Sequence, residues 1–239
     1  EGSTQNYNAG GVSSASSSCA VIGCVITNNT CAYRGGGVYA GTMIGCLISG
    51  NTCSSGTGPN GVAGQYFNCV IRSGYVYQNK TICNCLFDKA YFRNGDPAYN
   101  SVIYGTSLNE PVKYYRCVLG VAPKSGVAVE MNDGTVVLDS SSDFTADYAL
   151  KAGSQLINFG NNDYYEENFP AQWARFKDVD FRGGQRVYGG AIDAGPSEYD
   201  WTGSYGKVLA EKRVNVTAAS PYVVKKDDTT LTIPKGGTP

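Results

Sequence analysis

The sequence contains no histidine, and this absence excludes several kinds of catalytic site at once. Serine and cysteine nucleophiles that rely on an imidazole base cannot form, and neither can zinc sites with histidine ligands. Any general acid or base must therefore be a carboxylate, a lysine, a tyrosine or a cysteine.

Charge is also scarce. Charged residues make up 16% of the 239 residues, and the formal net charge is −1. Because there is no basic stripe to neutralise phosphates, we expect no nucleic-acid binding. No run of about 20 apolar residues occurs, so we also expect no membrane-spanning helix.

Glycine, tyrosine and cysteine, in contrast, are abundant, with 31, 18 and 9 residues. The cysteines lie within apolar, strand-like runs, where free cysteine behaves as a small buried hydrophobe. We favour free thiols in the core over a disulfide framework, although the sequence also allows one pair of cysteines to form a disulfide. Cys31 and Cys53 are 22 residues apart and either stack or form such a bond.

A five-residue phrase with a small central residue recurs along the first half of the chain, as in Ile22–Ile26 and Ile44–Ile48. Its central residues are Cys24, Cys46, Cys69, Cys85, Ser101 and Cys117. Their separations of 22, 23, 16, 16 and 16 residues suit single coils of a β-solenoid, in which each strand pairs with its copy one coil later. Because strand side chains alternate, we expect the first, third and fifth residues of each phrase to face a narrow core. The predicted fold is therefore an all-β, single-stranded parallel solenoid, with the central residues as a core ladder.

These phrases resemble right-handed parallel β-helix proteins of the pectate-lyase-like superfamily, over residues 8 to 145. The right-handed coil is implied by this resemblance. Pectin hydrolases of that fold carry an Asp-Asp pair and a Gly-His-Gly, whereas this chain has no histidine and its only Asp-Asp is Asp227-Asp228. The nearest approach to the acid and base cluster of a calcium-dependent polysaccharide lyase is Asp88-Lys89 with Arg72, Arg93 and Arg116.

The C-terminal half carries a second resemblance. Residues 147–161, 180–186 and 190–199 are similar to the C-terminal segment of the choice-of-anchor Q family of Bacteroidetes surface proteins, with a departure at Pro196-Ser197. The resemblance implies an extracellular or cell-surface location. We expect one β-helix domain over residues 1–200, its C-terminal cap segment at about 147–200, and a short β appendage or tail over 201–239.

Two interpretations remain open for the acidic residues of the cap segment. One is a calcium site, because carboxylate oxygens suit this ion, built from Asp178, Asp180, Asp193 and Glu198. The other, which we favour, is structural: Arg182 or Arg186 bonded to Asp193 would hold the cap over the open end of the solenoid. No other metal and no cofactor is indicated.

Aromatic residues supply the candidate ligand site. Flat rings beside amides and hydroxyls suit sugar faces. The aromatic residues proposed for this role lie in the C-terminal half and are Tyr164, Tyr165, Trp173, Tyr199 and Trp201. The alternative is that these rings fill the core. Residues 161–167 are expected to form a polar loop.

The favoured function is therefore a non-catalytic surface protein, an adhesin or glycan-contacting module whose partner is a polysaccharide or a host or surface glycan. A polysaccharide lyase acting on acidic glycans and a purely structural stalk are the alternatives. Oligomeric state is not indicated by the sequence.

Overall fold

The computed structural model describes residues 10–14, 19–54, 57–77, 81–93, 97–105, 112–187, 190–199, 217–218 and 232–233. The chain divides into two units, residues 1–199 and 200–239. In the second unit, strands β20 (Thr217–Ala218) and β21 (Thr232–Ile233) pair in parallel. The rest of the β appendage expected over residues 201–239 lies outside the described residues.

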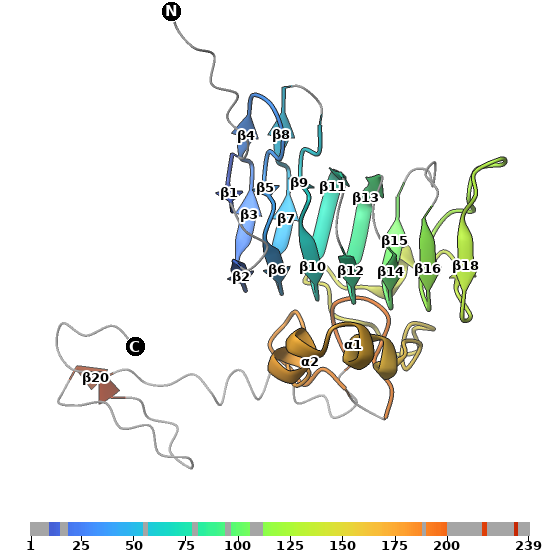
Figure 1. Cartoon of the computed structure of the whole chain (residues 1–239). Helices are drawn as coiled ribbons and strands as arrows, with labels where there is room; N and C mark the ends of the chain where they lie inside the picture. The colour runs from blue at the N-terminus through green and yellow to red at the C-terminus, as the bar shows by residue number, and fades with distance from the viewer. Residues whose placement is uncertain are drawn as a thin grey trace, which may run out of the picture. The chain divides into compact units, whose positions relative to one another are not determined.

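Short strands in two long parallel sheets dominate the first unit (Figure 1). The first sheet contains β1 (Val12–Ser13), β3 (Val25–Thr27), β5 (Val38–Tyr39), β7 (Leu47–Ser49), β9 (Gly61–Val62), β11 (Val70–Tyr77), β13 (Leu86–Arg93), β15 (Val102–Tyr104), β17 (Val118–Leu119) and β19 (Val136–Val137). The second sheet contains β2 (Ala20–Ile22), β6 (Thr42–Ile44), β10 (Gln65–Phe67), β12 (Thr81–Cys83), β14 (Ala98–Tyr99), β16 (Lys113–Tyr115) and β18 (Glu130–Asn132). The expectation of an all-β chain of parallel, repeated strands is confirmed.

Strand register follows the predicted repeat. Val25 pairs with Leu47, Leu47 with Val70, and Val70 with Leu86. The residue before each of these is a central cysteine of the repeat, so the cysteines stack in the same order: Cys24, Cys46, Cys69 and Cys85. The two longer coils differ by carrying an additional parallel pair, β4 (Thr30–Cys31) and β8 (Thr52–Cys53). In the 16-residue coils this insertion is absent, and β11 and β13 run continuously through the corresponding position.

A single left-handed residue joins every strand of the second sheet except β18 to the following strand of the first sheet. These residues have φ between 46° and 62° and are Gly23, Gly45, Asn68, Asn84, Asn100 and Arg116. We call this position, between a strand of the second sheet and the following strand of the first, the corner. Glycine and asparagine tolerate the left-handed conformation best, which explains their repeated use there. The corner interrupts the alternation of side chains along the chain.

This interruption corrects one expectation about the repeated phrase. The third and fifth residues face the solenoid core, as in Cys46 and Ile48. The first residue does not: Ile44 and Phe67 lie in a separate cluster with the C-terminal segment, and the core position is taken by the preceding residue, as in Tyr66. Strict alternation fails because the left-handed residue redirects the chain between the first and third positions.

The central residues of the phrase form a hydrogen-bonded ladder as well as a packed one. The Cys46 N–H donates to Cys69 Sγ at 3.4 Å, Cys69 N–H to Cys85 Sγ at 3.4 Å, and Cys85 N–H to Ser101 Oγ at 3.0 Å. Each side chain also donates to a carbonyl two residues earlier, as Ser101 Oγ does to Tyr99 O at 2.7 Å. The position therefore requires a small side chain that both accepts and donates.

The ladder cysteines other than Cys24 are buried, whereas Cys24 in the first coil is exposed. Burial raises the pKa of Cys117 to about 12, so this thiol keeps its proton at neutral pH. A protonated thiol is what the ladder uses, because Cys117 Sγ donates to the carbonyls of Ala98 and Tyr115.

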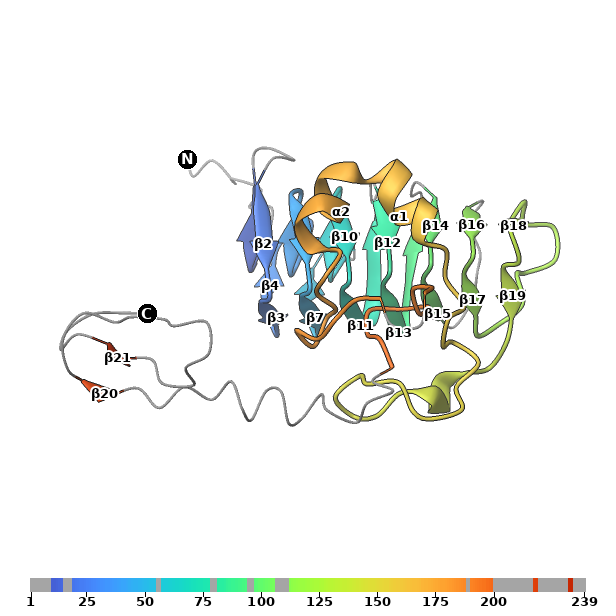
Figure 2. The same ribbon diagram turned by 90° about the horizontal axis from the view of Figure 1, so that it is seen from below.

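The C-terminal segment of the first unit packs along the side of the stacked coils. After the 3₁₀ helix η1 (Ser141–Asp143), Leu150, Leu156 and Ala194 cover the outward face of the first sheet. Helices α1 (Asn162–Asn168) and α2 (Pro170–Phe176) follow, and α1 places Tyr165 against the second sheet (Figures 1 and 2).

This arrangement corrects two expectations. The described part of the segment expected as a cap, residues 147–187 and 190–199, covers the flanks of successive coils rather than the open end, because the outward rows of both sheets are apolar and need cover. Residues 161–167, expected as a loop, form most of α1: Asn161 caps it by accepting the Asp163 N–H at 2.9 Å. Among the described residues, no helix has the length and hydropathy needed to cross a membrane.

The ladder predicts opposite outcomes for two substitutions of one residue. Ser101→Ala leaves the Cys85 N–H without its acceptor, at an expected cost of about 1–3 kcal/mol in the free energy of unfolding. Ser101→Cys restores the chemistry of the neighbouring coils and is expected to retain most of the stability. Urea unfolding measures both, and equal losses for the two variants would contradict a hydrogen-bonding role.

Candidate functional site

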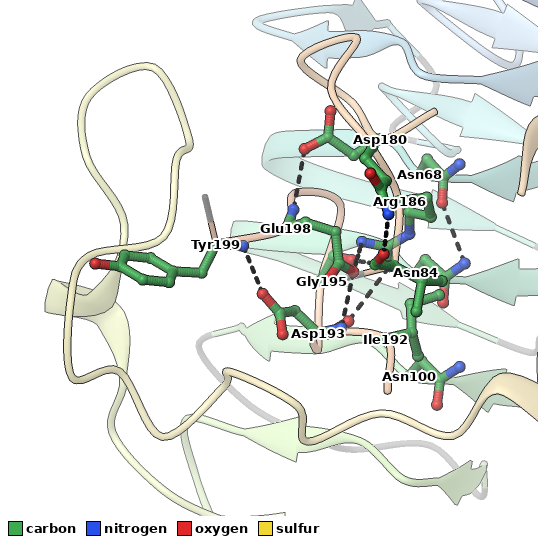
Figure 3. A network of polar contacts seen from close by, with 12 residues as sticks. Asn68, Asn84, Asn100, Asp180, Arg186, Ile192, Asp193, Gly195, Glu198 and Tyr199 are labelled. Carbon is green, nitrogen blue, oxygen red and sulfur yellow. Dashed lines mark hydrogen bonds and ion pairs between the residues drawn. The ribbon is translucent and has the colours of Figure 1, made fainter. Parts of the chain in front are cut away.

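Asparagines at the corner connect the stacked coils to the C-terminal segment, and two of them, Asn68 and Asn84, also bond to each other (Figure 3). Asn100 Nδ2 donates to Asn161 O, and Asn100 Oδ1 accepts the Asn161 N–H, both at 2.9 Å. Asn84 Nδ2 donates to Asn68 Oδ1 at 3.1 Å, and Asn68 Nδ2 donates to Val179 O at 3.4 Å. The residue type that permits the corner thus also supplies the docking contacts.

Arg186 is the centre of the polar network in this segment. Its side chain is fully buried and its Nη1 lies 2.8 Å from Glu198 Oε1. Its Nη2 donates to the carbonyls of Gly195 at 2.8 Å and Asp193 at 3.3 Å. The guanidinium therefore crosslinks two stretches of irregular chain that have no strand partner.

Two buried aspartates complete the network by accepting backbone N–H groups. Asp193 Oδ1 and Oδ2 accept from Asn158 and Tyr199, each at 2.6 Å. Asp180 Oδ2 accepts the Glu198 N–H at 3.0 Å. Burial raises the pKa of Asp193, and the two hydrogen bonds to its carboxylate act in the opposite direction.

The structure thus places three of the four calcium candidates, Asp180, Asp193 and Glu198, in one network, with oxygens bound to N–H groups. Asp178 is exposed and lines a separate hollow with Trp173 and Lys177. Across the described residues, no group of three or more side chains of the metal-binding types is arranged to hold an ion. Of the two arginines considered, Arg186 reaches the Asp193 carbonyl rather than its carboxylate, and Arg182 pairs with Asp147 at 2.8 Å.

The four candidate aromatic residues that the structure describes, Tyr164, Tyr165, Trp173 and Tyr199, are not brought together on one surface. Tyr165 is fully buried, stacked on Phe67 and edge-on to Trp173. Tyr164 instead contacts the stacked pair formed by Tyr99 and Tyr115. Tyr199 packs in the cluster over the first sheet, and Trp201 lies outside the described residues. Within the part described, these rings mainly hold the segment to the coils.

A hollow of about 250 Å³ lies on the outward side of the first sheet, beside the C-terminal segment. Arg72, Asp88 and Tyr104 occupy the same position on three successive coils, since Arg72 pairs with Asp88 and Asp88 with Tyr104. From the C-terminal segment, Phe144 and Tyr148 contribute rings to the wall. Two layers of the molecule therefore build this site together.

The hollow combines opposite charges with a neutral phenol. Arg72 Nε lies 3.1 Å from Asp88 Oδ2, and their side chains are 50% and 26% exposed, so both reach solvent. Tyr104 Oη lies 2.5 Å from Ser140 Oγ. Burial raises the pKa of Tyr104 above its ordinary value, so the hydroxyl stays protonated at neutral pH.

The structure separates the residues of the lyase-like cluster. Arg72 and Asp88 meet, whereas Arg116 lines a different hollow with Asp133 and Asn162, and its Nε donates to Phe159 O at 2.6 Å. The side chain of Arg93 lies outside the described residues.

Sequence reasoning missed Tyr104, Phe144 and Tyr148 as parts of one site. The signal for Tyr104 was present, because it follows Arg72 and Asp88 at the 16-residue spacing. Phe144 and Tyr148 come from a segment whose docking depends on tertiary contacts. Comparisons with protein-family models, curated proteins and solved structures found no match for this chain.

The buried network predicts a large difference between two arginines of the same segment. Arg186→Met leaves Glu198 buried without its cation, at an expected cost of about 3–5 kcal/mol. Arg182→Met is the matched control, because its partner Asp147 is 64% exposed and the loss is expected to be below about 1 kcal/mol. Urea denaturation compares them, and similar midpoints would rule out Arg186 as the anchor.

Proposed function

We propose that the protein is a non-catalytic extracellular or cell-surface module that binds a glycan. Its framework would be a right-handed parallel β-helix whose C-terminal segment, of the choice-of-anchor Q type, wraps the coils. The observation that carries the proposal is the hollow on the first sheet, where the solvent-accessible Arg72–Asp88 pair lies beside the Tyr104 phenol and the rings of Phe144 and Tyr148.

The chemistry of this hollow suits a chain of sugars. A carboxylate and a guanidinium present several acceptors and donors in fixed planes, which match the neighbouring hydroxyl groups of a sugar ring. Aromatic rings offer apolar faces for the C–H groups of the same sugar. Because the hollow is small and its polar residues reach solvent, it fits one unit of a polymer better than an enclosed small molecule.

A lyase acting on acidic glycans is the second candidate, favoured by the same residues. Arg72 could neutralise an acidic sugar, and the Tyr104 hydroxyl stands near enough to the hollow to take part in proton transfer. The pairing of Arg72 with Asp88 supports binding more than catalysis, since the guanidinium already has an anionic partner. A purely structural stalk remains the reading if neither binding nor cleavage occurs.

Retention on immobilised polysaccharides tests the proposal. On a panel of plant, mucin and bacterial polymers, with calcium, we expect the chain to bind at least one polymer without shortening it. Asp88→Asn and Tyr148→Ala should each weaken that binding by about tenfold, through a lost charged hydrogen bond and a lost ring contact.

Lys113→Gln is the matched control, because Lys113 belongs to an exposed ion pair on the second sheet and should leave binding unchanged. Products with an unsaturated end, detected by mass spectrometry, would replace the binding proposal with the lyase. No retention on any polymer would favour the stalk.

A further inference from the structure

The long coils contain a pair of cysteines outside the core ladder. Cys31 in β4 and Cys53 in β8 are direct partners in a parallel register, and their Sγ atoms lie 3.3 Å apart. The adjacent Thr30 and Thr52 hydroxyls are 2.8 Å apart, so the two strands are held level at this point. Figure 1 shows β4 and β8 side by side, beyond the ends of β3 and β7.

Solvent access distinguishes this pair from the other neighbouring thiols. Cys53 is partly exposed, whereas Cys46, Cys69 and Cys85 are fully buried. The hydrogen bond with Cys69 and, to a smaller extent, burial raise the pKa of Cys46 well above its ordinary range. This disfavours the thiolate that thiol–disulfide exchange requires. Exposed Cys24 therefore stacks on an unreactive neighbour, while Cys31 has a partner that an oxidant can reach.

We propose that Cys31 and Cys53 are a modification site at which a disulfide forms, fastening the two long coils to each other. The pairing of adjacent parallel strands brings the two Cα atoms to about 4.8 Å, within the range that a disulfide spans. The inference is independent of glycan binding and concerns the opposite end of the coil stack from β19.

The oxidant is a small-molecule disulfide. The Cys53 thiolate attacks one sulfur of that molecule and releases its other half as a thiolate, which gives a mixed disulfide. Cys31, after losing its proton, attacks Cys53 Sγ and displaces the second half. Two protein thiols are oxidised, one disulfide is reduced to two thiols, and the two protons pass to the released thiolates.

Oxidised glutathione is the probe. The reduced protein is incubated with it under native conditions, quenched with acid, denatured and alkylated. Mass spectrometry should show that two of the nine cysteines are no longer alkylated, and that Cys31 and Cys53 peptides are joined. Because a disulfide restricts the unfolded chain, the melting temperature of the oxidised protein should rise by several degrees.

Cys53→Ser should abolish the loss of alkylation, whereas Cys24→Ser, the control at an exposed thiol of the coil that carries Cys31, should leave it intact. Peptide mapping of the oxidised protein without any substitution decides the question even if Cys53→Ser does not fold. Nine alkylated cysteines in excess oxidant, a stable glutathione adduct on Cys53, or a crosslink between other cysteines would each overturn the proposal.

Discussion

The solenoid depends on one hydrogen bond that is repeated from coil to coil. At the corners before Cys46, Cys69 and Cys85 the chain passes through a left-handed residue, and the N–H of the cysteine that follows points to the neighbouring coil. The side chain one coil later accepts that N–H, through sulfur in Cys69 and Cys85 and through oxygen in Ser101. A buried N–H without an acceptor would be costly, so the choice of side chain at this position is narrow. Cysteine satisfies it while also filling apolar space.

The sequence analysis predicted the repeat because the relevant signal is local and periodic. The separations of the central residues match the strand register, and the additional length of the first coils corresponds to β4 and β8. The direction of individual side chains was predicted less well, since the alternation rule does not apply across the left-handed corner. Ile44 was therefore assigned to the wrong side of its strand.

Elements held by tertiary contacts were not predicted. Helix α1 is short and polar, and its burial rests on Tyr165 against Phe67, a contact that no sequence period reveals. The hollow on the first sheet was half visible in the sequence: Arg72 and Asp88 were considered together, but the rings that complete it come from the wrapping segment. Arg186 was one of the two arginines expected to bond Asp193, but its ion pair is with Glu198, and Asp178 lies apart from the other three acidic residues.

The type of residue at the corner differs between the first two coils and the coils that follow. In the first two coils it is Gly23 and Gly45, whose absent side chains leave nothing to dock, whereas Asn68, Asn84 and Asn100 hold the segment or each other in the coils that follow. The outward apolar row has a matching boundary, because Val25 in the first coil is 69% exposed and Val70, Leu86 and Val102 are buried. A simple array of coils would be able to lose its units one at a time, since each contacts only its neighbours. Here the C-terminal segment contacts several coils at once, so a coil that unfolds must also break its contacts with this segment. Cooperativity is thereby imposed on the middle of the stack, and the first coil is left as the place where fraying costs least.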